Sequence, residues 1–199
     1  MTTQSSMHFY LDWAKERLDE MDATLASLEG TAGKLRADAR AKADLALTEI
    51  RNRRDDFQQI IEKQREAGEA TWVAVKATLE RDWKAFEASV QKYIEAAGEQ
   101  IGAREAAFRA GVDAQMKAWQ EVAGKLHNAA AGFAADRRGE VEAIVKRMKD
   151  DAAGAEAKLD KLSRAGAQSW SALNSALAET RAAFDRANQA AQDAFKNAR

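Results

Sequence analysis

Residues 57–122 read FQQIIEKQREA, GEATWVAVKAT, LERDWKAFEAS, VQKYIEAAGEQ, IGAREAAFRAG and VDAQMKAWQEV, in successive segments of eleven. Large apolar side chains return mainly at the first, fifth and eighth positions of these segments. Because an α-helix has about 3.6 residues per turn, eleven residues complete almost three turns, and these positions fall in a strip about 65° wide. The stretch therefore predicts a long amphipathic helix with one narrow apolar seam.

An eleven-residue period keeps this seam nearly straight, with at most a slight right-handed supercoil. The strip is narrower than the apolar face of a typical globular surface helix, which spans about 100° or more. It suits a coiled-coil partner or a shallow interface. The residues predicted to form an interface seam along the whole chain are Leu11, Leu18, Leu25, Phe57, Trp72, Leu79, Trp83, Phe86, Val90, Ile94, Ile101, Phe108, Val112, Trp119, Trp170, Leu173, Leu177 and Phe184.

Alanine fills a second column, at the seventh position of every segment except the first, which has Lys63 there. Its members are Ala74, Ala85, Ala96, Ala107 and Ala118. Alanine is the best helix former and is common at exposed helical positions, which explains the column without any contact. Alternatively, small residues let another helix approach closely, so that the long helix would have neighbours on two sides.

Composition favours an elongated all-helical chain. The 199 residues include no proline, which would break helices, and 46 alanines, so large apolar side chains are scarce. A single compact core needs more of them than a coiled coil, in which each residue packs only against a neighbouring helix. We therefore expect an all-α protein of very long amphipathic helices, arranged as a coiled coil, a helical hairpin or an elongated bundle.

Charge and cysteine content limit which kinds of partner and which cellular compartment we expect for this protein. The formal net charge is −1, whereas nucleic-acid binding selects a clearly basic surface, so we expect no nucleic-acid partner. The absence of cysteine fits a reducing compartment. The N-terminus lacks the features of a secretory signal, and no run approaches the about 18 apolar residues that span a membrane. These features indicate a cytoplasmic protein.

Residues 1–35 carry a seven-residue period, which is typical of a left-handed coiled coil. One column contains Leu11, Leu18 and Leu25, and the other contains Ala14, Met21 and Leu28. We expect an N-terminal heptad helix here. Gly30 and Gly33 near its end mark either a kink or an early reversal of the chain, because glycine weakens a helix.

The rest of the chain is predicted to form one elongated structural unit with this helix. A long helix with the eleven-residue period is expected over 36–125. Beyond Trp119 the bulky positions shift by one residue, onto the alanine-rich face. The shift coincides with residues 126–140, which form either a hairpin turn or an unbroken helix with a local change of phase. A second helix of the same period is expected over 141–199.

Residues 34–54 are locally basic. The basic side chains are Lys34, Arg36, Arg40, Lys42, Arg51, Arg53 and Arg54. They are candidate contacts to an anionic surface. A solvated helix face with intrachain ion pairs accounts for the same pattern and is the simpler interpretation.

No residue pattern points to catalysis. The two histidines, His8 and His127, lie far apart in the sequence and belong to no Glu-x-x-His or His-Glu-x-x-His motif. The glycines are scattered singly, so no phosphate-binding loop is formed. We expect no catalytic residue, no metal, no cofactor and no small-molecule substrate, and hence no enzyme. The five tryptophans are either core residues between helices or groups that insert into a lipid or polymer interface.

The eleven-residue repeat resembles that of the exchangeable apolipoproteins and, more loosely, the lipid-surface helices of perilipins and synucleins. The residues that carry this resemblance are Phe57, Ile61, Val75, Leu79, Trp83, Phe86, Val90, Ile94, Ile101, Phe108, Val112 and Trp119. In size, alanine richness and lack of cysteine the chain is also similar to the bacterial phasins. These resemblances imply a reversible coat on lipid or on a storage granule.

Two functions remain open from the sequence. The first is a structural or assembly protein, a rod, scaffold or filament component that self-associates as a homo-oligomer through helix–helix packing. The alternative is an amphipathic coat on a membrane or a hydrophobic granule.

Overall fold

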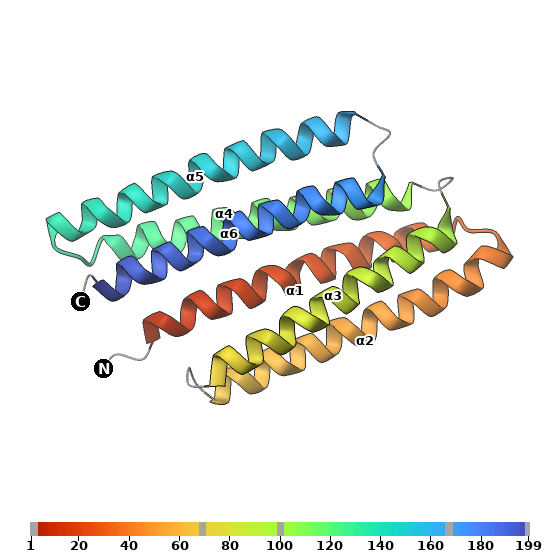
Figure 1. Cartoon of the computed structure of the whole chain (residues 1–199), viewed down its shortest axis with the longest axis horizontal. Helices are drawn as coiled ribbons and strands as arrows, with labels where there is room; N and C mark the ends of the chain where they lie inside the picture. Colours follow the sequence, from red (N-terminus) through yellow and green to blue (C-terminus); the bar gives the residue numbers. More distant parts are fainter. Residues whose placement is uncertain (1–3, 68–70, 99–101, 166–168, 198–199) are drawn as a thin grey trace. The chain divides into compact units, whose positions relative to one another are not determined.

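The computed structural model describes residues 4–67, 71–98, 102–165 and 169–197, and these ranges are helical except for short links (Figure 1). The helices are α1 (Gln4–Ala32), α2 (Ala37–Ala67), α3 (Trp72–Ala97), α4 (Ala103–Ala130), α5 (Ala135–Arg164) and α6 (Trp170–Asn197). No strand occurs in these ranges. The expected all-α class is therefore confirmed for the described chain.

The chain divides into two compact units. The first unit is Ala14–Gly111 and holds most of α1, α2, α3 and the start of α4. The second unit combines Met1–Trp13 with Val112–Arg199, and so holds the rest of α4, α5, α6 and the first turns of α1. Each unit has its own packed helices and its own buried apolar side chains.

The predicted single helix over 36–125 is wrong. The structure distributes this range over α2, α3 and most of α4. α3 ends at Ala97, because Gly98 adopts φ 67° and ψ −176°, and Gly102 just before α4 also has a positive φ, of 63°. Glycine reaches these conformations without steric strain, so a helix can end there without any proline.

The predicted continuous helix over 141–199 is also wrong. α5 ends at Arg164, and Ala165 and Ser169 lie outside the helices. The absence of proline removes one way of breaking a helix, but it does not hold two neighbouring helical segments in line.

Two further links fall where the sequence contains candidate turns. α1 ends at Ala32, directly before Gly33, and α2 begins at Ala37. α4 ends at Ala130 and α5 begins at Ala135, inside the range 126–140. At this second link the amide of Gly132 donates to the carbonyl oxygen of Ala129 at 3.2 Å, which is a tight turn rather than a helix with a change of phase.

In the first unit, α2 and α3 pack side by side (Figure 1). α2 buries Ala43, Ala46, Leu47, Ile50 and Phe57, and α3 buries Leu79, Trp83, Phe86, Val90 and Tyr93. These positions recur three, four, seven or eleven residues apart, so they lie on one face of each helix. Burying each large side chain stabilises the pair by about 1.5–3 kcal/mol.

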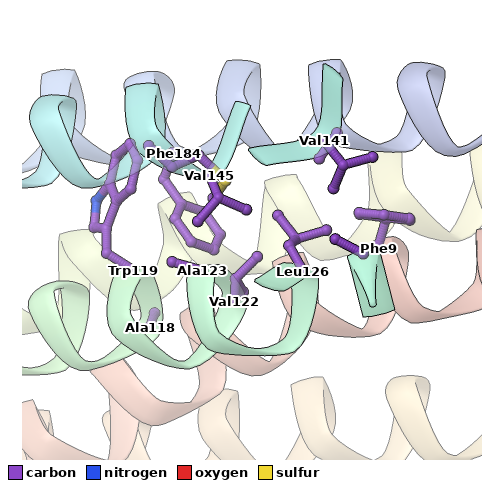
Figure 2. Packing of buried hydrophobic residues seen from close by; sticks show 12 residues of the cluster. Phe9, Ala118, Trp119, Val122, Ala123, Leu126, Val141, Val145 and Phe184 are labelled. Atoms are coloured by element: carbon purple, nitrogen blue, oxygen red, sulfur yellow. The ribbon is translucent and has the colours of Figure 1, made fainter. Parts of the chain in front are cut away.

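The core of the second unit draws on four helices (Figure 2). Trp119, Val122 and Leu126 of α4 pack with Val141 and Val145 of α5 and with other buried residues, Phe9, Ala118, Ala123, Ala130, Met148, Phe184 and Ala191. The rings of Trp119 and Phe184 meet edge to face, with centroids 5.4 Å apart. Such aromatic pairs add about 0.5–1.5 kcal/mol to the burial of their area.

Substituting two of the glycines is expected to change stability in opposite directions. Gly154→Ala within α5 should raise the free energy of unfolding by about 1 kcal/mol, because glycine is a poor helix former. Gly98→Ala should lower it by about 1–2 kcal/mol, because alanine is strained at positive φ. An added Cβ meets no atom within 4 Å at either position, so steric clash does not confuse the comparison. Urea unfolding followed by circular dichroism measures both, and equal signs would contradict the assigned helix end.

Candidate interaction surfaces

Most of the predicted seam lies inside the two units. The buried members are Phe57, Trp72, Leu79, Trp83, Phe86, Val90, Phe108, Trp119, Leu173, Leu177 and Phe184. Leu11, Leu18, Leu25, Ile94, Val112 and Trp170 are half-buried, and Ile101 lies outside the described residues. In the folded chain the seam is therefore mainly a set of intramolecular contacts.

The heptad columns of α1 differ in burial. Ala14, Met21 and Leu28 are fully buried, whereas Leu18 and Leu25 remain partly exposed. The two columns look equivalent in the sequence, but in the fold one column is central, meaning fully buried, and the other is marginal, meaning partly exposed to solvent. In the described chain only Leu45 and Val73 are large apolar residues with high exposure, at 70% and 81%, and they lie on different helices.

The alanine column also divides. Ala107 and Ala118 are buried, Ala85 and Ala96 are half-buried, and Ala74 is exposed. The column therefore marks buried positions in its later part and a solvent-facing position at its start. Alanine serves both environments because it is small and favours the helix.

A buried hydroxyl links α3 to α1 in the first unit. Tyr93 donates a hydrogen bond to the carbonyl oxygen of Leu28 at 2.8 Å and lies 3.0 Å from the hydroxyl of Thr31. Burial raises the pKa of Tyr93, since the phenolate would lose its hydration. The link fixes how the two helices are aligned along their axes, because a shift would leave buried polar groups unpaired.

Similar polar links occur in the second unit. The amide of Asn188 on α6 donates to the carbonyl oxygen of Phe9 at 2.8 Å, and Gln115 on α4 donates to that of Leu177 at 3.2 Å. Both amides are buried, so each hydrogen bond compensates for lost hydration. The periodicity of large apolar residues could not reveal these links, because they depend on which helices become neighbours.

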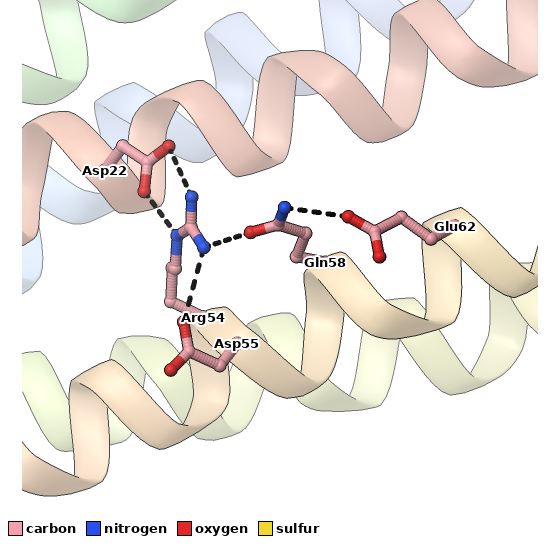
Figure 3. Close-up of polar contacts among 5 residues, drawn as sticks. All are labelled: Asp22, Arg54, Asp55, Gln58 and Glu62. Atoms are coloured by element: carbon pink, nitrogen blue, oxygen red, sulfur yellow. Dashed lines mark hydrogen bonds and ion pairs between the residues drawn. The ribbon is translucent and has the colours of Figure 1, made fainter.

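The locally basic stretch forms ion pairs within the first unit, and Arg54 makes the most extensive set (Figure 3). Its Nε and Nη2 atoms lie 2.5 Å and 3.2 Å from the two carboxylate oxygens of Asp22 on α1. The guanidinium also contacts Asp55 and Gln58, and Gln58 donates to Glu62 at 2.8 Å. The hydrogen bond to Asp22 raises the pKa of Arg54. This two-point geometry is the strong form of an arginine–carboxylate pair.

Other charges of α2 also face its neighbours. Arg51 lies 2.7 Å from a carboxylate oxygen of Glu29 on α1. Glu49 pairs with Lys92 of α3 at 2.8 Å, and this hydrogen bond lowers the pKa of Glu49. Both pairs are exposed and screened by solvent, so they contribute little to the stability of the fold.

The remaining basic candidates stay at the surface. They are the exposed side chains Lys34, Arg36, Arg40, Lys42 and Arg53, of which Arg40 lies 3.9 Å from Asp44. The stretch is thus divided between intrachain ion pairs and solvent.

A groove runs between α5 and α6 in the second unit, with a volume of about 930 Å³. Its walls are rich in small residues, among them Gly154, Ala155, Ala183 and Ala187. Sequence periodicity did not single it out. The sequence feature that could have indicated the groove is the run of small residues 152–155, between the buried Met148 and Leu159. Side chains this small cannot fill the space towards α6.

No group of three or more potential metal ligands occurs among the described residues. Within the same ranges, no helix combines the length and the apolar character needed to cross a bilayer. Comparisons with protein-family models, with curated proteins and with solved structures give no match to this chain. The fold and the buried seam define an all-helical protein whose amphipathic helices pack as bundles within its units.

Proposed function

We propose that this protein is a non-enzymatic surface coat, whose amphipathic helices pack on one another in the free state and spread on a lipid membrane or a hydrophobic granule when the bundle opens. The observation that carries the proposal is that the apolar seam and the buried face are largely the same residues, such as Leu79, Phe86 and Val90. Opposite them lie charged faces, which is the pattern of helices that lie flat in an interface. The resemblance to exchangeable apolipoproteins and phasins supports the same function.

Opening is compatible with the forces that hold the units together. On an apolar surface the seam leaves its helical neighbours but is still removed from water, so most of the hydrophobic free energy is retained. The backbone hydrogen bonds stay within each helix, so the change leaves no backbone group unpaired. A cytoplasmic location is part of this proposal.

The second proposal is an assembly role, as a rod, scaffold or filament component built from coiled-coil pairs. It is favoured by the seven- and eleven-residue periods and by the burial of Ala107 and Ala118 in the alanine column. In such an assembly, helices of different chains would take the places that helices of one chain occupy in the monomer. We rank it second because the seam is already satisfied within a single chain.

A cross-link tests whether opening is required. The chain has no cysteine, so Glu49→Cys with Lys92→Cys can be joined across α2 and α3 by a short bismaleimide. The matched control joins Lys76→Cys to Glu80→Cys, an ion pair within α3 that does not restrict separation of the helices. Flotation with phosphatidylcholine vesicles, with and without phosphatidylglycerol, measures binding.

We expect the cross-link between α2 and α3 to weaken vesicle binding by at least about tenfold and the control to have little effect, since only the first keeps the seam closed. Absence of vesicle and granule binding by the unmodified protein would overturn the coat function. A melting temperature that rises over a hundredfold increase in protein concentration would instead support self-association, because subunit pairing stabilises by mass action.

A further inference from the structure

The groove between α5 and α6 is long enough to be a site for one acyl chain. Its lining runs from Ile144 to Lys158 on α5 and from Glu179 to Asp193 on α6. Fourteen helical steps correspond to about 21 Å. One acyl chain occupies about 15 Å in each leaflet of a bilayer, half of the hydrocarbon thickness. The groove is therefore long enough for such a chain lying parallel to the helices.

The floor of the groove is apolar and is formed by small or flexible side chains. Four lining side chains also belong to the apolar core of the second unit. Met148 of α5 is a member of its hydrophobic cluster, and three others pack against that cluster, namely Ile144 of α5 and Ala183 and Ala187 of α6. Because residues 152–155 carry little side-chain volume, α5 covers the cluster here without filling the space above it. An apolar ligand in this place would remove further apolar surface from water.

The rim of the groove carries charges of both signs. Lys158 and Glu179 form an ion pair across the groove at one end. The lining also holds Arg147, Asp151 and Arg186, which form no ion pair with any described residue, and Asp193, whose contact is a hydrogen bond from Gln189 at 3.1 Å. Since α5 and α6 run antiparallel (Figure 1), Arg147 and Asp193 lie towards the end opposite the Lys158–Glu179 pair.

We propose that this groove binds a single-chain zwitterionic lipid, with its acyl chain on the apolar floor and its headgroup at the end near Arg147 and Asp193. A guanidinium fits the phosphate of such a headgroup, and carboxylates fit its ammonium group. A purely anionic or purely cationic amphiphile would meet like charges at the same rim. This site belongs to the folded bundle, whereas the coat function requires the bundle to open, so each can fail without the other.

Two glycines of α5 provide a matched pair of variants. Gly154 lines the groove and Gly139 does not, both are exposed, and an added Cβ meets no atom within 4 Å at either position. Gly154→Phe places a ring in the groove, and Gly139→Phe makes the same change on the same helix outside it. Circular dichroism shows whether both variants retain the helical fold.

The experiment is a calorimetric titration of the full chain with lysophosphatidylcholine below its micelle concentration. We expect saturable binding of one molecule per chain, a loss of at least about tenfold in affinity for Gly154→Phe, and no loss for Gly139→Phe. A monoacylglycerol and a lysophosphatidate of equal chain length should bind more weakly. Equal binding by the two variants, or no saturable binding at all, would overturn the proposal. So would a change of sedimentation behaviour confined to Gly154→Phe, because it would indicate that the groove receives a helix of a second copy.

Discussion

Replacing Trp119 by alanine is expected to lower the free energy of unfolding by about 3–5 kcal/mol, the largest single effect in the second unit. The side chain is 1% exposed and packs edge to face on Phe184, so the substitution removes an aromatic pair and leaves a cavity. Protein interiors close such cavities only in part, because the surrounding helices are already close-packed. Urea unfolding followed by far-UV circular dichroism gives the change in free energy.

Trp119→Phe is the control for this prediction. The indole nitrogen of Trp119 is buried and has no hydrogen-bond partner in the described chain. Phenylalanine removes this unsatisfied donor and keeps an aromatic ring beside Phe184, so its effect should be well below that of alanine. If the two substitutions destabilise equally, Trp119 does not have the packing role assigned to it.

In the first unit, Leu79→Ala is expected to destabilise by about 2–5 kcal/mol, and Leu45→Ala by less than about 0.5 kcal/mol. The two leucines have the same chemistry and both lie within helices, but Leu79 is 0% exposed and Leu45 is 70% exposed. The difference between the variants therefore isolates burial from helix propensity. The same unfolding measurement applies to both.

A small effect of Leu79→Ala would mean that α3 does not bury this face. A large effect of Leu45→Ala would mean that α2 has an apolar contact outside its face towards α3. The first of these results would also weaken the proposed coat function, because that function depends on a seam that is covered in the free protein.

The periodicity of the sequence was sufficient to predict helical segments, and many of the apolar residues that it singled out are buried in the fold. Leu79 and Val90 are eleven residues apart, and both are buried on α3. Phe57 and Trp119 lie on other helices and follow the same rule. The reason is local, because each residue turns a helix by a nearly constant angle and the spacing of apolar residues then determines which face avoids water.

The ends of the helices were not determined in the same way. Gly98 ends α3, whereas Gly139 and Gly154 lie within α5, although the residue is the same. Glycine costs about 1 kcal/mol in a helix, which packing can exceed where the flanking residues are buried together. The sequence pattern continues through each of these glycines, so it could not show which of them would end a helix.

What the sequence by itself determined is thus the all-helical class and the direction in which most large side chains of each helix point. Only the tertiary structure decided that Met21 and Leu28 are central while Leu25 is marginal, that Arg54 pairs with Asp22, and that a groove opens beside Gly154. These features depend on which helix lies beside which, and at what axial alignment. That choice is made by the combined packing of several segments, and no single segment encodes it.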